Sequence, residues 1–306
     1  MFKDNINKLK EQKMFKDLAH STFLPNAVLT LFIFSVLWAV SFNLGGFIAM
    51  YTLKGVADEN LYLSLRRIIR CCFQISVFFI WVRFIEKRKL CTLGFRHNKR
   101  LYDFFIGFLI GTISITIITI SLFFVGAIQI EIRKNINMSV NTYAGIVAIV
   151  LGWIVQSASE EIGIRGWLIP LLGARYSVIA SIFITSVVFG VLHLFTPAAT
   201  VLSFVNLILS GVFFALYAVS EDCLWGVWGC HFGWNLALGN IYSFGVSGFS
   251  SIGYSIFKIK VIGSNILTGG SFGPEGGLLA TVALTIGIIV CSSRIVRSVS
   301  SEKVIV

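Results

Sequence analysis

Two consecutive glutamates, Glu160 and Glu161, lie in the middle of the apolar stretch WIVQSASEEIGIRGWLIPLL. An ionisable group inside a membrane costs at least a few kcal/mol, so it indicates a function unless it is neutralised. Glu161 and Arg165 are spaced i, i+4 in the favourable order for an ion pair along one edge of a helix. Glu160 points about 100° away from that edge and has no such partner. It is therefore the carboxylate expected to act as a general base or a metal ligand.

Two histidines lie in later apolar stretches, each with a companion four residues away on the same helix face. His193 follows Phe189 in FGVLHLF, and His231 precedes Asn235 in GCHFGWNLALGN. Three polar faces on three separate segments must meet one another, because lipid offers them no hydrogen-bond partner. We therefore expect the segments to converge, so that an acid, two imidazoles and an amide share one pocket with water.

The elements that position these residues are membrane helices. Of the 306 residues, 56% are hydrophobic and 13% are charged, and the mean hydropathy is +0.86. Soluble domains are nearer a quarter charged. The net charge of +11 is carried by short stretches between apolar runs, which is typical of membrane topology and not of nucleic-acid binding. These features exclude a soluble enzyme, a nucleic-acid-binding module, a disordered chain and a disulfide scaffold.

A membrane-spanning helix needs about 20 apolar residues, and the sequence offers eight such stretches. They are residues 27–53, 68–85, 104–128, 143–164, 177–196, 200–219, 224–246 and 276–296. We therefore predict an all-α polytopic membrane protein with about eight transmembrane helices. Pro25 and Pro274 fit helix starts and Pro197 a helix end, while Pro170 should kink or terminate the fourth helix. A turn near residues 173–176 would bring Glu160 and His193 to a similar depth.

The distribution of basic residues predicts the orientation. They gather in the N-terminal segment, in the link from Arg83 to Arg100 and in the C-terminal tail. With an even number of spans, the positive-inside rule places all three in the cytoplasm, so we predict a cell-membrane protein with both termini cytoplasmic. Arg66, Arg67 and Arg70 depart from this pattern, because they fall at the predicted outer start of the second helix.

The resulting organisation has four parts. They are an amphipathic cytoplasmic segment (1–21), three transmembrane helices (22–142) with a basic cytoplasmic link (83–103), a core of five transmembrane helices (143–296) and a cytoplasmic tail (297–306). The six cysteines form no CxxC pair, and we expect them to pack as small apolar side chains.

Acid–base groups inside a membrane favour peptide hydrolysis or proton-coupled transport. A zinc protease helix needs HExxH, which is absent from the sequence, and an aspartyl site needs two intramembrane aspartates, whereas all five lie outside the predicted spans. The segment Gly245-Val246-Ser247-Gly248 looks like the GxSG of rhomboid proteases, but no histidine follows His231 on a later helix. We interpret it as a glycine-rich turn. A glutamate-based site is the remaining class of hydrolase.

The ordered strings Glu160-Glu161-x-x-x-Arg165, Phe189-x-x-x-His193 and His231-x-x-x-Asn235 resemble three motifs of the CPBP family. This family includes CAAX prenyl endoproteases and bacteriocin-processing and immunity proteins. The resemblance covers about residues 143–296, and the segment GGSFGPEGG (269–277) looks like bacterial members. It implies an intramembrane endopeptidase of the bacterial cell membrane, with eight helices around a conical catalytic cavity open to the cytosol and lipid.

The resemblance and the residue types together suggest a mechanism. Glu160, assisted by His193, would deprotonate a water, and Asn235 with His231 would donate hydrogen bonds to the oxyanion. Glu161 and Arg165 would hold the helix in register, and Phe189 would pack beside His193. Alternatively, Glu160, His193 and His231 would be three zinc ligands with water in the fourth position. We favour the metal-free site and assign no cofactor, with zinc as the alternative.

The expected substrate is a membrane-associated peptide or a lipidated protein precursor, with membrane lipids as surroundings and no nucleic acid as partner. Two other functions stay open. One is a non-catalytic immunity or binding protein, and the other is a transporter in which Glu160 and the histidines relay protons. The clustering of the polar residues near one level favours hydrolysis over transport.

Overall fold

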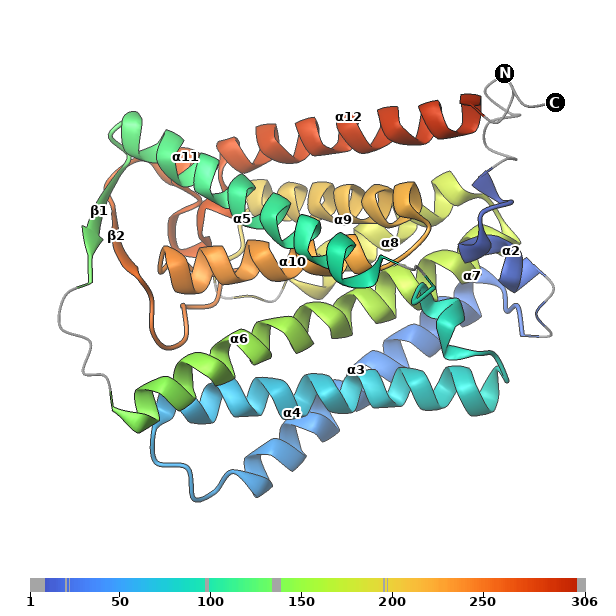
Figure 1. The fold of residues 1–306 in the computed structure, drawn as a ribbon, viewed down its shortest axis with the longest axis horizontal. Coiled ribbons are helices and arrows are strands. Elements are labelled where there is room, and N and C mark those ends of the chain that lie inside the picture. Colours follow the sequence, from blue (N-terminus) through green and yellow to red (C-terminus); the bar gives the residue numbers. More distant parts are fainter. Residues whose placement is uncertain are drawn as a thin grey trace.

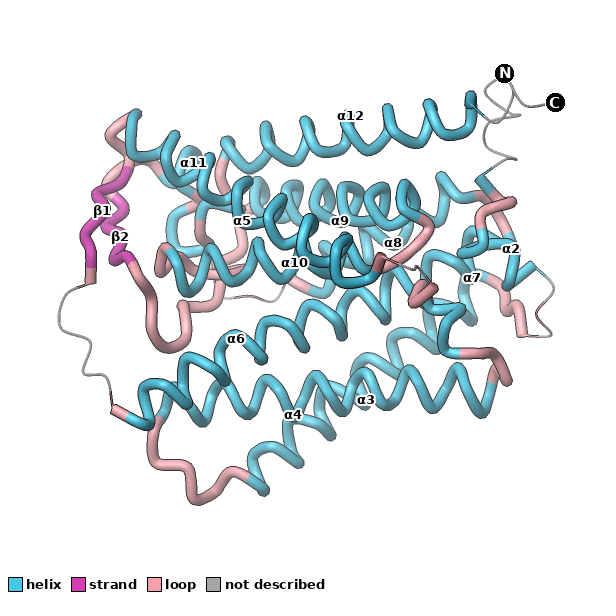
Figure 2. The backbone as a smooth tube through the Cα atoms, viewed as in Figure 1, coloured by secondary structure: helices cyan, strands magenta, loops and turns pink. Residues whose placement is uncertain are grey.

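The computed structural model describes residues 9–19, 21, 23–96, 99–133, 139–194, 196 and 198–301, and it confirms an all-α membrane fold (Figure 1, Figure 2). The α-helices are α2 (Lys13–Ala19), α3 (Ala27–Thr52), α4 (Glu59–Ile80), α5 (Arg100–Phe124), α6 (Val140–Glu161), α7 (Ile169–Arg175), α8 (Val178–Leu192), α9 (Val201–Glu221), α10 (Trp225–Leu236), α11 (Asn265–Thr268) and α12 (Leu278–Ser301). Short π-helices are η1 (Trp81–Ile85), η3 (Ile162–Leu168) and η4 (Ala237–Ile241). Short 3₁₀-helices are η2 (Leu90–Leu93), η5 (Gly270–Phe272) and η6 (Pro274–Gly276).

Six helical segments of the described chain are long and apolar enough to cross a membrane. They are Ala27–Thr52, Glu59–Ile85, Arg100–Phe124, Val140–Arg175, Val201–Glu221 and Leu278–Ser298. The other two predicted spans are also helical, but α8 has 15 residues and α10 has 12. At about 1.5 Å per residue, neither α-helix alone crosses a hydrocarbon layer of about 30 Å. By this length criterion the described chain has six candidate spans where the sequence predicted eight, because an apolar run does not show where a helix ends.

The second membrane helix begins at Glu59 and not at residue 68. Asp58 is its N-cap, and its side chain accepts a hydrogen bond of 2.8 Å from the backbone of Leu61. This cap sets the start of the helix, although the first turns of the helix are polar. The arginines at positions 66, 67 and 70 consequently lie inside α4, more than one turn beyond its start.

The fourth helix continues through Pro170 and ends at Arg175. Residues Ile162–Leu168 form the π-helix η3 immediately before α7, and Pro170 lies in the first turn of α7. Because the hydrogen-bond pattern changes from π to α at that point, the helix continues although Pro170 has no N–H to donate. The chain then turns, and Ser177 caps α8. This is the turn that was predicted near residues 173–176.

Helix α10 packs against α5 by direct contact of the two backbones. A Cβ atom on Gly229 would lie 1.9 Å from the carbonyl oxygen of Phe104, and one on Gly233 would lie 2.3 Å from that of Phe108. Small residues allow membrane helices to approach in this way. His231 is two residues from each glycine, about 200° around the helix, so it faces away from α5.

Two short strands, which the sequence analysis did not predict, lie at one end of the bundle. β1 (Ile128–Ile132) pairs antiparallel with β2 (Phe257–Val261). We call this the sheet end (Figure 1). At the opposite end lie α2, the link between α4 and α5, and the last turns of α12, and we call this the basic end (Figure 1).

Contacts at the basic end join segments that are distant in sequence. Arg96 donates a 3.0 Å hydrogen bond to the carbonyl oxygen of Lys13. The Asp222 carboxylate, just after α9, accepts from the backbone N–H groups of Lys13 and Met14 at 3.0 and 2.9 Å. The described parts of the three basic segments therefore lie on one side, as the sequence predicted. Pro197 and residues 302–306 of the predicted tail lie outside the described residues, and residues 297–301 continue α12.

Candidate active site

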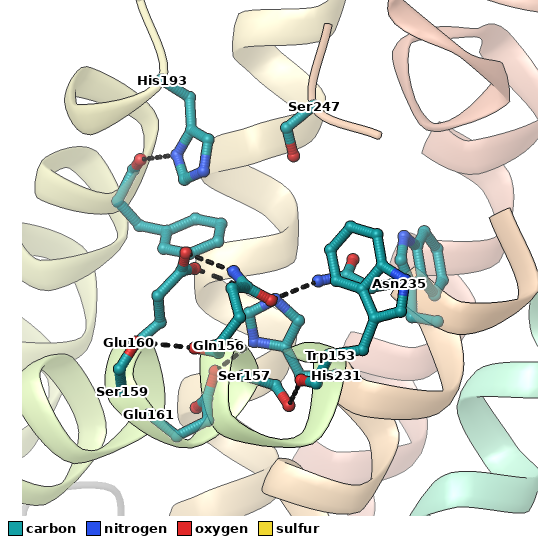
Figure 3. A network of polar contacts seen from close by, with 12 residues as sticks. Trp153, Gln156, Ser157, Ser159, Glu160, Glu161, His193, His231, Asn235 and Ser247 are labelled. Atoms are coloured by element: carbon teal, nitrogen blue, oxygen red, sulfur yellow. Dashed lines mark hydrogen bonds and ion pairs between the residues drawn. The ribbon is translucent and has the colours of Figure 1, made fainter. Parts of the chain in front are cut away.

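A cavity of about 620 Å³ is lined by helices α3, α4 and α6 together with α8, α9 and α10. Glu160, His193, His231 and Asn235 all contribute to its wall. Figure 3 shows these side chains around a common space, although they come from α6, α10 and the end of α8. The structure therefore brings together the polar residues that were predicted to converge.

Glu160 is held by a residue of its own helix that the sequence analysis missed. The Gln156 amide, one turn earlier, donates a 2.5 Å hydrogen bond to Oε1 of Glu160, and its own Oε1 accepts a 2.9 Å bond from Nδ2 of Asn235. The expectation that Glu160 has no local partner was wrong, because only charged residues were considered as partners. Oε2 of Glu160 is buried and has no hydrogen-bond partner among the described residues.

Glu161 has two partners at once. Nη1 of Arg165 donates to Oε1 of Glu161 at 3.0 Å, and both side chains are buried, as the predicted ion pair requires. The same oxygen lies 2.7 Å from Nδ1 of His231. A carboxylate can only accept, so Nδ1 of His231 carries the hydrogen. Nε2 of His231 lies 3.8 Å from Oε2 of Glu160. Glu161 therefore orients an imidazole of the site, in addition to pairing with Arg165.

His193 is the C-cap of α8 and does not lie within the helix as its apolar surroundings suggested. Its Nδ1 atom is 2.8 Å from the carbonyl oxygen of Phe189, so Nδ1 is the donor and Nε2 is left to the cavity. No hydrogen bond or ion pair joins His193 to Glu160 or Glu161 in the described structure. The imidazole beside Glu160 is thus that of His231.

Aromatic rings enclose the charged groups of the site. The guanidinium carbon of Arg165 lies 4.6 Å from the ring centroid of Phe189 and 5.3 Å from that of Phe214. Phe189 packs beside His193 with ring centroids 4.8 Å apart, as predicted, and Phe214 stacks on His231 at 5.0 Å. Such apolar walls reduce the local dielectric constant and strengthen the hydrogen bonds between Arg165, Glu161 and His231.

The glycine-rich segment before α12 adds a carboxylate to the cavity wall. Glu275 accepts a 3.0 Å bond from Nε1 of Trp234 and another from the backbone N–H of Ser247. Burial raises the pKa of Glu275, and these two hydrogen bonds act in the opposite direction. Residues 245–248 form the predicted turn, with Ser247 in the left-handed region at φ +50°. Glu275 therefore ties this turn to α10.

The side chains considered as zinc ligands do not form a three-ligand group as they lie. Throughout the described part of the chain, no three His, Cys, Asp or Glu side chains are grouped closely enough to hold a metal ion. Glu160 and His231 are neighbours, but Nδ1 of His193 is bound to a backbone carbonyl. We therefore derive no catalytic step through a metal ion.

Residues 141–237 match the family model described as type II CAAX prenyl endopeptidase, Rce1-like. This range runs from α6 to the start of η4 and contains every residue of the three motifs. The match supports the resemblance to the CPBP/CAAX protease family that the motifs predicted, and the apolar helices are those of a membrane protein. No curated protein and no solved structure shows a significant match to the chain.

Proposed function

We propose that the chain is an intramembrane endopeptidase in which Glu160 activates a water molecule. The observation that carries this proposal is the separation of 3.8 Å between Oε2 of Glu160, which is buried and unpaired, and Nε2 of His231. A water that bridges the two atoms at about 2.8 Å from each would donate one hydrogen to each, and a small movement of the side chains must admit it because Oε2 is buried. A lone pair of that water then remains available for attack on a carbonyl carbon.

In the proposed reaction, the water attacks the scissile carbonyl carbon while Glu160 accepts its proton. Nδ2 of Asn235 donates one hydrogen to Gln156, and its second hydrogen is available for the developing oxyanion. The C–N bond then breaks, and the proton passes from Glu160 to the leaving amine. The products are a carboxylate and an amine, and no acyl-enzyme forms. Nε2 of His193 lies at the cavity as a second group that can carry a proton.

The geometry supports a revised assignment of the two histidines within this mechanism. His231 is assigned to the water beside Glu160, and Glu161 holds it in the required tautomer. His193 is assigned to the substrate side of the cavity. Arg165 compensates the charge of Glu161, and Phe189 separates Arg165 from the cavity. No cofactor is assigned.

The proposed substrate is a membrane-associated peptide or a lipidated protein segment. The cavity wall includes the aromatic side chains Trp38 and Phe42 of α3 beside the polar groups of α6 and α10. An apolar wall next to a polar floor suits a chain segment that enters from the membrane. We further propose that the basic end lies in the cytoplasm.

The test is a comparison of the peptides released from cells that carry the wild-type chain or Glu160→Ala. We expect specific fragments in the wild type that are absent in Glu160→Ala and in His231→Ala. Glu131→Gln, an exposed acid on β1, is the matched control and should give the wild-type pattern. Fragments that persist in Glu160→Ala would contradict the proposal. If the wild type releases no fragments, and cells that carry Glu160→Gln are still protected against a toxic peptide, the chain would instead be a non-catalytic immunity or binding protein.

A further inference from the structure

Three arginines of α4 line the same cavity, although α4 precedes the family-matched range. They are Arg66, Arg67 and Arg70. None of them forms an ion pair with a carboxylate of the described residues, whereas the two glutamates of the cavity wall are hydrogen-bonded to other groups. The cavity wall therefore carries three guanidinium groups and two carboxylates, and no direct ion pair joins them among the described residues.

Arg67 and Arg70 also keep buried donor atoms without partners. Nη1 of Arg67 and Nε of Arg70 make no hydrogen bond. Each guanidinium contacts an aromatic face instead, Arg67 at 3.7 Å from the ring centroid of Trp153 and Arg70 at 4.3 Å from that of Phe42. Stacking fixes the plane of a guanidinium but does not provide hydrogen-bond acceptors for the N–H groups at its edge. Buried, unpaired arginine donors on a cavity wall are suited to an anionic ligand.

The packing of α4 on α6 sets the distance from these arginines to Glu160. A Cβ atom on Gly152 of α6 would lie 3.5 Å from the side chain of Arg67, and one on Gly163, in η3 directly after α6, would lie 3.2 Å from that of Phe78. The segment α6–η3 therefore runs parallel to α4. Trp153, which stacks on Arg67, precedes Glu160 by seven residues, or about 10 Å along α6. An extended peptide advances about 3.3 Å per residue. A group bound at Arg67 would thus lie about three residues from the peptide bond at Glu160.

We propose that Arg67 and Arg70 form a carboxylate-binding subsite of the cavity, which binds a carboxylate of the substrate about two or three residues from the cleaved bond. Gln74 lies one turn beyond Arg70 on the same face of α4, and its buried Nε2 atom is also unpaired. The carboxylate is either the C-terminus of the substrate or an acidic side chain. This inference rests on the proposed function, because it assigns how a substrate is bound in that cavity.

Binding to purified Glu160→Gln protein tests the subsite without requiring cleavage. The probes are three N-dodecanoyl tetrapeptides of alanine and leucine: one with a free C-terminus, one with a C-terminal amide, and the amide with an aspartate at the third position. We expect the free acid or the aspartyl probe to bind at least about tenfold more tightly than the plain amide, as charge-assisted hydrogen bonds would provide. Which of the two gains affinity identifies the source of the carboxylate.

Substitutions on α4 then show which residues cause the tighter binding of the acid probes. In the Glu160→Gln background, Arg67→Gln and Arg70→Gln should each reduce the affinity ratio between acid and amide to about one, and Arg67→Lys should retain part of it. Arg83→Gln, on the exposed π-helical extension of α4, is the matched control and should leave the ratio unchanged. Thermal unfolding of each variant shows whether the fold is kept, and Arg70→Gln and Arg67→Lys serve where Arg67→Gln does not fold.

Equal affinities for the acids and the amide, or a preference that survives both Arg67→Gln and Arg70→Gln, would overturn the subsite. These outcomes are distinct from failure of the proposed function, which would appear as fragments that persist in Glu160→Ala cells. If the stacked arginines had only a structural role, the variants would lose stability, and the wild-type arginines would give no difference in affinity between the acid and amide probes.

Discussion

Nδ1 of His231 lies 2.7 Å from Oε1 of Glu161, although the two residues are 70 positions apart in the sequence. This contact links the first motif, which contains Glu161, to the third, which contains His231. The same oxygen also accepts a hydrogen bond from Arg165. The carboxylate is therefore shared between a guanidinium and an imidazole. It fixes which nitrogen of His231 faces Glu160, in the way that carboxylates behind metal-bound or catalytic histidines fix their tautomers.

We predict that Glu161→Gln reduces kcat by about 10- to 100-fold, by analogy with the loss of other groups that orient a functional histidine. It should also lower the free energy of unfolding by about 3 kcal/mol or more, because Arg165 becomes a buried charge without a counter-charge. Cleavage kinetics and thermal unfolding in detergent measure the two effects.

The double variant Glu161→Gln/Arg165→Met separates these effects. It removes the unpaired charge, so stability should recover, while His231 still lacks its carboxylate and activity should stay low. Recovery of activity together with stability would show that Glu161 acts only through its ion pair with Arg165.

Gln156 connects Asn235 to Glu160, and its loss should affect both ends of that chain of hydrogen bonds. We predict that Gln156→Leu lowers kcat by about 100-fold, since the carboxylate and the oxyanion donor both lose their positions. Ser157→Ala is the matched control, because Ser157 is buried next to Gln156 but bonds only within its own helix. A kcat for Gln156→Leu within twofold of the wild type would refute this role.

The sequence predicted the class of fold because apolar runs and charge distribution are local properties. It placed the turn after α7 correctly, since Ser177 and the preceding change in apolar pattern are visible in the chain. It could not locate the ends of α8 and α10 or the start of α4, which depend on caps and on packing between helices. The ladder of β1 and β2 joins segments more than 120 residues apart, so no local pattern indicates it.

The three motifs gave the polar residues of the cavity wall but not their pairing. Which histidine lies beside Glu160 depends on where α8 ends and on the backbone contact of α10 with α5, and neither is encoded in motif spacing. Gln156 was detectable, because it lies one turn from Glu160 on the same helix face. The arginines of α4 were visible as an exception to the positive-inside pattern, and that exception was the signal of a further polar wall.

The zinc alternative makes a distinct prediction about chelation. If Glu160 and His231 activate water without a metal, cleavage by the purified protein should be unchanged within about twofold after dialysis against a strong chelator. Cleavage kinetics of the purified protein in detergent measure the effect, and a zinc protease treated in parallel provides the positive control. Loss of cleavage that is restored by added zinc would contradict the metal-free mechanism and favour Glu160, His193 and His231 as ligands.

The family resemblance implies a cavity that is open to the cytosol. The positions of the residues that border the cavity test this expectation. The cavity wall also includes Thr196 and Ser250 from loops and Glu275 from the short 3₁₀-helix η6. Glu275 immediately precedes α12, whose last turns lie at the basic end, and Ser250 follows η4 and precedes β2 of the sheet end (Figure 1). The loops that border the cavity therefore lie toward the sheet end.

If the basic end is cytoplasmic, as proposed, we predict that the cavity is reached from the opposite side of the membrane. In intact cells, a membrane-impermeant maleimide should label Ser250→Cys in a background without Cys72 and Cys91, because Ser250 is exposed at the cavity wall. The native Cys91, exposed in η2 at the basic end, should react only after the membrane is permeabilised, in a background without Cys72. The reverse pattern would place the cavity mouth in the cytoplasm. Labelling of both sites in intact cells would contradict the separation of the two ends by the membrane.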